Sequence, residues 1–132
     1  MTSCIVIDTN IALDLLVFGD PACVPLQAAL DAGELRWLAT AAMRDELARV
    51  LGYPQIAPRL AHYGRTPEAV LADFDRQSQQ VEPAPRASVV CKDPDDQIFI
   101  DLAVAHRAPL RSKDRAVLVL RKRLAALGVE VS

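Results

Sequence analysis

The sequence predicts an α/β fold with a mainly parallel sheet and helices on both of its faces. Strand-like and helix-like segments alternate from one end of the 132 residues to the other, which is the pattern of such folds. The first segment, Ile5-Val6-Ile7, is apolar, too short for a helix and without alternation, as in a strand buried on both faces. Asp8 follows it directly, and open α/β sheets bind ligands at the carboxyl ends of their strands.

Length and composition suit a single domain that spans residues 1–132. Hydrophobic residues make up 52% of the chain and charged residues 24%, so we expect a buried core rather than disorder. No apolar run approaches the ~20 residues of a membrane span, and the N-terminus lacks a signal-peptide pattern. We therefore expect a cytoplasmic protein without a membrane partner. The three cysteines contain no CxxC pair, which argues against a disulfide framework or a zinc site.

Caps and helix breakers delimit the remaining elements. Thr9 or Asn10 is expected to cap the first helix, Thr40 the third, and Thr66, followed by Pro67, the fifth. Glycine and proline residues stop several of the helices. Strands are thus expected over residues 4–7, 35–39, 88–90, 108–111 and 129–131, and helices over residues 11–18, 23–32, 41–51, 56–63, 67–80, 94–107 and 115–127.

Two acids are expected on helix faces that should be apolar. Glu46 stands three residues after Met43 and four before Val50, in or beside the apolar stripe of its helix. Asp96 heads the core-facing stripe of the helix that begins near Pro94. An acid at such a place is normally excluded unless it pairs with a cation or binds a metal.

Asp8 and Asp114 share another pattern, in which an acid stands between a strand and a helix. Either acid could simply cap the helix that follows, and Glu46 could instead form a salt bridge. Four such carboxylates in an alternating parallel fold together favour a site for Mg²⁺ or Mn²⁺, which prefer oxygen ligands. Without a cation, clustered carboxylates would repel one another and raise one another's pKa.

The net charge of −2 is unevenly distributed along the chain. Residues 1–106 carry 8 Lys or Arg and 15 Asp or Glu, whereas residues 107–132 carry 7 and 2. The basic cluster could attract a polyanion, although a solvated helix face is the simpler explanation. Other kinds of site find little support in the sequence. The two histidines have no partner at the spacing of a metal site or a catalytic triad, and the five glycines form no phosphate-binding loop.

These segments, in this order, resemble the PIN-domain ribonuclease family, in particular its branch of toxin components of toxin–antitoxin systems (VapC-like). The resemblance covers nearly the whole chain. It rests on IVIDTN from Ile5, DELARVL from Asp45, CKDPDDQIF from Cys91 and SKD from Ser112. It implies a three-layer α/β/α sandwich with a central parallel sheet, Mg²⁺- or Mn²⁺-dependent cleavage of single-stranded RNA, a homodimer, and a cognate antitoxin protein as partner.

Carried over by position, the family's metal-binding acids fall on residues of this chain already singled out. They are Asp8, Glu46, Asp96 and Asp114, with Asp93 as a further candidate. The polar residue near the first acid falls on Asn10, and the small hydroxyl before the last acid falls on Ser112.

The sequence departs from the family pattern in two places. Many relatives have another acid two positions after the last one, where this chain has Ala116, so a second metal would have fewer ligands. Relatives also commonly continue past the last strand into a short helix, whereas the sequence ends at Ser132. Either the C-terminal edge is reduced or the chain was cut.

The resulting hypothesis is a metal-dependent endoribonuclease. The four acids would hold the ion that activates a water for in-line attack on the phosphodiester. The residues expected to position water or substrate are Asn10, Ser112, Arg111, Lys113 and Arg115, the last three as contacts to RNA phosphates.

Two alternatives stay open. One is a non-catalytic PIN-like module that binds RNA or protein, and Ala116 is its best support. The other is a phosphoryl-transfer receiver or a phosphatase. A phosphatase of that kind would usually need a second Asp where Asn10 stands, which disfavours this alternative.

Overall fold

The computed structural model describes residues 2–132 and contains one four-stranded parallel sheet. Its strands are β1 (Ser3–Ile7), β2 (Leu35–Ala39), β3 (Ser78–Gln80) and β4 (Leu110–Arg111), arranged in the order β3-β2-β1-β4. Ile5 of β1 pairs with Trp37 of β2, and Val6 pairs with Leu110 of β4. All of these pairings are parallel, as the sequence predicts.

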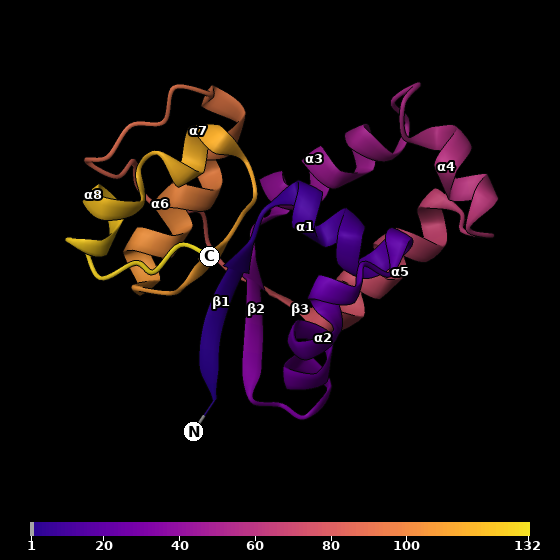
Figure 1. The fold of residues 1–132 in the computed structure, drawn as a ribbon, viewed down its shortest axis with the longest axis horizontal. Coiled ribbons are helices and arrows are strands. Elements are labelled where there is room, and N and C mark those ends of the chain that lie inside the picture. Colours follow the sequence, from indigo (N-terminus) through magenta and orange to yellow (C-terminus); the bar gives the residue numbers. More distant parts are fainter. Residues whose placement is uncertain (1) are drawn as a thin grey trace.

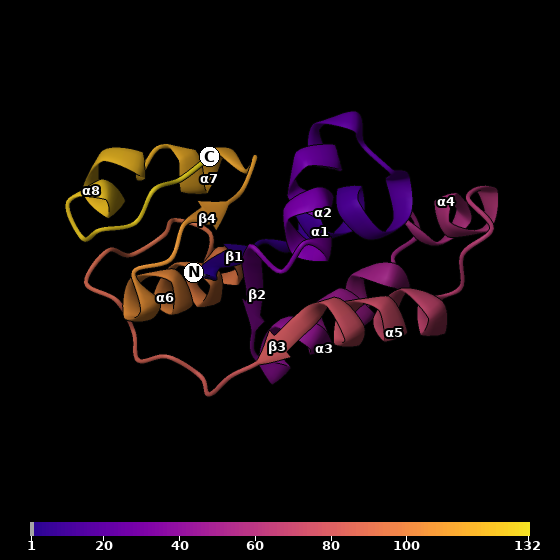
Figure 2. The same ribbon diagram turned by 90° about the horizontal axis from the view of Figure 1, so that it is seen from below.

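Helices cover both faces of this sheet. They are α1 (Thr9–Leu13), a π-helical continuation of α1 (Asp14–Phe18), α2 (Val24–Asp31), α3 (Ala41–Leu51), α4 (Ala57–His62), α5 (Pro67–Gln77), α6 (Gln97–His106), α7 (Arg115–Leu118) and α8 (Arg121–Ala125). Short 3₁₀ turns span Pro21–Cys23 and Pro94–Asp96. The two ribbon views place α6, α7 and α8 on one side of the sheet and α1, α2, α3 and α5 on the other (Figures 1 and 2). This is the three-layer α/β/α arrangement.

The core is centred on β1 and β2. The three apolar residues that end β1 are all buried, and Trp37 of β2 is only 1% exposed. Trp37 meets Phe74 of α5 edge to face, with ring centroids 5.1 Å apart. The three cysteines are free thiols in or beside this core.

The strand order reverses beside β1, and this reversal positions the candidate site. From β1 the chain passes to β2 and β3 on one side, and it returns to β4 on the other. At such a switch point the connections leave in opposite directions and open a crevice beyond the carboxyl ends of the strands. Asp8 directly follows β1 and Ser112 directly follows β4, so both residues border this crevice.

Two predictions for the region from the end of α5 to the start of α6 were wrong. The helix expected over residues 67–80 ends at Gln77, and Ser78–Gln80 form β3 instead. No strand forms over residues 88–90. The segment around them is held by a side chain: Gln97 Oε1 accepts a hydrogen bond from the Cys91 backbone N–H (2.6 Å), and Gln97 Nε2 donates one to the Val89 carbonyl (3.0 Å).

Asp101 belongs to the same arrangement. Its Oδ1 accepts hydrogen bonds from the Ala87 backbone N–H (2.9 Å) and from Gln97 Nε2 (2.8 Å). Side chains of α6 therefore satisfy backbone groups that would otherwise need a neighbouring strand.

The C-terminal elements are shorter than predicted. The helix expected over residues 115–127 is divided into α7 and α8, and the strand expected over residues 129–131 is a single parallel bridge between Val131 and Leu110. The helix expected over residues 94–107 begins with a 3₁₀ turn, so α6 itself starts at Gln97.

Within residues 2–132 no single helix has both the length and the apolar composition of a membrane span. One bent pair, Thr9–Phe18 with Pro21–Asp31, meets those two criteria jointly and bends by 102°.

Candidate metal centre

Asp8 closes β1 and is held from two sides. Its Oδ1 accepts a hydrogen bond from the Ile11 backbone N–H (2.9 Å), so the N-cap of α1 is Asp8 and not Thr9 or Asn10. Its Oδ2 accepts one from Ser112 Oγ (2.5 Å). Asp8 is 3% exposed, and this burial raises its pKa although both hydrogen bonds oppose the effect.

Ser112 links the two strand ends that border the crevice. Its hydroxyl donates to Asp8 and accepts a hydrogen bond from the Asp114 backbone N–H (3.1 Å). Asp114 in turn caps α7, with Oδ1 accepting from the Ala116 backbone N–H (3.0 Å). The predicted strand–acid–helix pattern is therefore present twice, and one serine joins the two copies.

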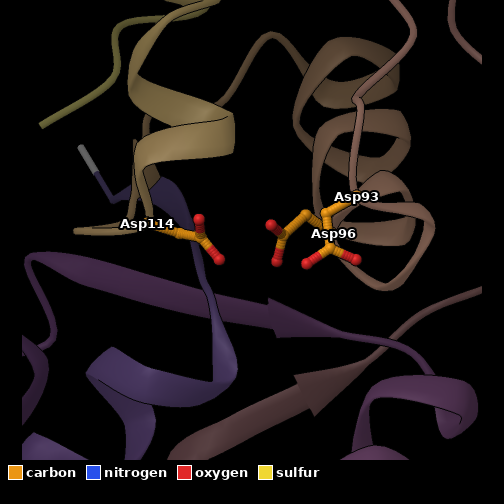
Figure 3. Close-up of side chains that lie close together, drawn as sticks. All are labelled: Asp93, Asp96 and Asp114. Carbon is orange, nitrogen blue, oxygen red and sulfur yellow. The ribbon is translucent and has the colours of Figure 1, made fainter.

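Asp96 and Asp114 face each other across the crevice, and Asp93 lies beside them (Figure 3). One carboxylate oxygen from each of these three residues lies within 4.8 Å of the other two. Asp96 Oδ2 is buried and has no hydrogen-bond partner among the described residues. Burial, then the facing Asp114 carboxyl and repulsion from other neighbouring carboxylates, raise the pKa of Asp96 to about 8.

Glu46 reaches the same region from α3. Its Oε2 accepts a hydrogen bond from the Thr9 hydroxyl. Burial raises the pKa of Glu46, the hydrogen bond from Thr9 opposes that change, and the charge of Asp95 adds to it. Glu46 therefore lies near several carboxylates, as its place on the apolar stripe of α3 predicts. Thr9 was assigned only as a possible cap, and no sequence pattern indicated that it would contact Glu46.

The four predicted acids line one hollow of about 170 Å³. Its lining residues are Asp8, Thr9, Asn10, Glu46, Val50, Tyr53, Asp93, Asp95, Asp96 and Asp114. The sequence patterns predicted no role in this site for Asp95 or Tyr53. Only the turn composition around residues 52–54 hinted that the end of α3 would be a loop, and nothing local placed that loop beside the acids.

The other predicted positioning residues occupy different places. Asn10 is exposed and lines the hollow, whereas Ser112 is buried beneath Asp8. Lys113 Nζ forms an ion pair with Asp14 (2.7 Å), and an Arg111 guanidinium nitrogen donates to the Ala22 carbonyl (3.3 Å). Neither of these basic residues lines the hollow, and nor does the exposed Arg115.

The donor set of this hollow suits a hard divalent cation. The residues that line it include several carboxylates and no lysine or arginine. Asp96 Oδ2 is a buried acceptor without a donor, which costs free energy unless a cation or proton neutralises it. Mg²⁺ and Mn²⁺ bind such all-oxygen sites, so the residues present fit the predicted metal.

Comparison with known proteins gives a family and a fold. The PIN domain family matches residues 4–110, well over half of the chain. The fold is similar to that in a crystal structure of VapBC2 from Rickettsia felis bound to a DNA fragment from their promoter, with a TM-score of 0.65 and 12% sequence identity over 98% of each chain. A search of curated protein sequences found no match. At this identity the structural likeness bears on the fold alone.

Proposed function

Because this chain belongs to the PIN domain family, whose members are generally nucleases, we propose that it is a metal-dependent endoribonuclease that cleaves single-stranded RNA. The observation that carries the proposal is the pairing of Asp96 with Asp114. A buried carboxylate oxygen without a donor faces a second carboxylate, and Asp8 and Glu46 line the same hollow. Such a cluster is costly for folding and useful for holding a divalent ion.

Asp8, Glu46, Asp96 and Asp114 would hold the ion, with Asp93 as an additional ligand. A bound Mg²⁺ or Mn²⁺ supplies water activation and offsets the negative charge that develops on the phosphodiester. Ser112 and Ile11 fix the Asp8 carboxylate through hydrogen bonds of 2.5 and 2.9 Å, so its orientation does not depend on substrate. Thr9 orients Glu46 in the same way.

The biological setting that we propose is a toxin–antitoxin system. The support is the resemblance of the sequence to toxin components, together with the fold similarity to VapBC2, which is described bound to promoter DNA. A cognate antitoxin protein would then be the partner. The homodimer and the cytoplasmic location remain predictions from the sequence.

The decisive experiment measures cleavage of labelled single-stranded RNA with Mn²⁺, with Mg²⁺ and with a chelator. Glu46→Gln and Asp45→Asn form a matched pair on α3, because Asp45 is exposed and outside the hollow. We expect at least about 100-fold slower cleavage for Glu46→Gln, since second-shell changes alone commonly cost 10–100-fold, and near wild-type cleavage for Asp45→Asn.

Two results would contradict this proposal. Cleavage that continues at the same rate in chelator excludes a required metal. RNA binding without turnover in either metal favours the non-catalytic binding module instead.

A further inference from the structure

Tyr53 is the one aromatic residue in the lining of the acidic hollow. Apart from Tyr53 and Val50, that lining consists of acids, Thr9 and Asn10. Tyr53 is 37% exposed, so part of its ring is accessible to a ligand. Tyr63, also exposed, packs near Phe18 with ring centroids 5.5 Å apart, whereas no aromatic partner of Tyr53 is found within residues 2–132.

The backbone of Tyr53 is fixed although its ring is partly exposed. Its N–H donates to the Val50 carbonyl (3.0 Å), and its carbonyl accepts from the backbone N–H groups of Ile56 (2.9 Å) and Ala57 (2.8 Å). The turn between α3 and α4 therefore holds this residue at the rim of the hollow. A ring on an ordered turn loses little conformational entropy when it binds a flat ligand.

Charge makes this end of α3 the favourable approach for a polyanion. The rest of the rim carries carboxylates from the 3₁₀ turn Pro94–Asp96 and from Asp114, which repel phosphates. Arg49 is exposed on α3 three residues after Glu46, so its positive charge lies on the same helix face and acts to lower the pKa of Glu46. A nucleic acid strand that reaches the carboxylates over Arg49 and Tyr53 meets a cation and an aromatic ring before it meets the acids.

We propose that Tyr53 is a base-stacking residue, against which a nucleobase next to the scissile phosphate packs. This inference rests on the proposed nuclease function and specifies its substrate further. A base can lie flat on an aromatic ring only when it is unpaired, so the subsite selects single strands over duplexes. Because every base has a π-face, the same contact tolerates many sequences.

The test is binding of a short fluorescein-labelled single-stranded RNA in Ca²⁺, which occupies oxygen sites and is used here to limit cleavage. Tyr53→Ala is expected to weaken binding by about tenfold, the usual scale for one stacked base. Tyr53→Phe should restore wild-type binding, because the ring and not the hydroxyl is needed, whereas Tyr53→Leu should bind as weakly as Tyr53→Ala. The matched control is Tyr63→Ala, which removes an exposed ring outside the hollow.

Two further measurements separate stacking from a general effect on the site. One scans the RNA with a single abasic nucleotide, and at one position the tenfold difference between wild type and Tyr53→Ala should disappear. The other uses Tyr53→Trp, whose indole should be quenched by added RNA. The natural tryptophan, Trp37, is 1% exposed and cannot report on that contact.

The outcomes distinguish this inference from the proposed function. If the wild-type protein cleaves RNA but Tyr53→Ala or Tyr53→Leu binds as tightly as wild type, stacking is wrong and the nuclease function stands. The same conclusion follows if Tyr53→Trp fluorescence is unaffected by an RNA that the variant binds. If wild type neither binds nor cleaves single-stranded RNA, both proposals fall.

Discussion

The Gln97 side chain supplies hydrogen bonds to the backbone of the segment 87–91 that a neighbouring strand would otherwise supply. It is 4% exposed and contacts the Cys91 N–H, the Val89 carbonyl and Asp101. These bonds hold the segment that leads into Asp93, and hence into the acidic hollow. A glutamine in the first turn of a helix is common, so nothing local in the sequence indicated this role.

Replacing Gln97 by alanine should therefore destabilise the protein by about 3 kcal/mol. The substitution leaves the Cys91 N–H and the Val89 carbonyl without their hydrogen-bond partner, at a cost of about 1–3 kcal/mol each. Urea unfolding followed by circular dichroism measures this difference in the free energy of unfolding. Gln79→Ala, at an exposed position of β3, serves as the control and should change stability by less than about 0.5 kcal/mol. Equal stability of the two variants would show that the Gln97 contacts contribute little.

Asp96 is predicted to lower the stability of the metal-free protein. Asp96→Asn removes a half-buried acid next to Asp114 and provides an amide that can donate to it, so metal-free stability should rise by about 1 kcal/mol. In the wild type, Mn²⁺ should raise the midpoint of thermal unfolding, since a ligand that binds only the native state stabilises it. That increase should be much smaller in Asp96→Asn, and an equal increase in both proteins would place the ion elsewhere.

At this residue scale, the sequence patterns predicted that four acids would come together but not which residues would contact them. Asp8 and Asp114 follow strands, and Glu46 and Asp96 interrupt apolar stripes, so local patterns alone indicated all four. Residues that contact them across the fold, among them Thr9, Tyr53 and Gln97, carry no such pattern. Their roles depend on tertiary neighbours that a single sequence does not reveal.

At the scale of elements, β3 shows why one strand was missed. Its residues are polar, and they form a strand because Trp37, Leu38 and Ala39 of β2 present a parallel edge to them. The β-branched residues Val89 and Val90 looked more strand-like, yet their segment is held by α6. Strand formation at a sheet edge depends on the neighbouring strand more than on intrinsic propensity.

The charges of Arg65, Asp73 and Arg76, at α5 and just before it, predict how stability depends on pH. Partial burial acts to raise the pKa of Asp73, but hydrogen bonds and charges from Arg65 and Arg76 outweigh it and lower this pKa. A depressed native pKa stabilises the fold above the unfolded value of 3.8, and this contribution is lost as the pH falls through the native pKa. Asp73→Asn should thus be less stable near neutral pH, by up to about 1 kcal/mol, and should match wild type in strong acid.

Urea titrations at neutral and at acid pH measure this effect. Asp45→Asn provides a control at an exposed position of α3, where the difference from wild type should be near zero at both pH values. A constant deficit of Asp73→Asn at all pH values would mean that packing, rather than charge, links Asp73 to its arginines.

At the scale of the whole molecule, the last residues complete the sheet edge that carries part of the site. Ser112 N–H donates to the Ser132 carbonyl (2.9 Å), and Leu110 exchanges backbone hydrogen bonds with Glu130 and Ser132. Val129 and Val131 are buried.

Deleting residues 129–132 should therefore destabilise the protein by at least about 3 kcal/mol, since two valine side chains leave the core. The same deletion should greatly weaken Mn²⁺ binding measured by calorimetry, because it loosens the segment from Ser112 to Asp114. Glu130→Ala keeps the backbone and removes an exposed side chain, so it should retain both properties. Undiminished Mn²⁺ binding by the truncated protein would contradict the link between this edge and the acids.

The hydrogen bond between Asp8 and Ser112 also constrains when the protein can become active during its synthesis. Asp8 is synthesised well before its partners at the end of β4, and these partners need backbone bonds to residues 130–132. A nascent chain still held in the exit tunnel therefore lacks one half of the acidic hollow. For the proposed nuclease, a working site therefore forms only after residues 130–132 have left the exit tunnel.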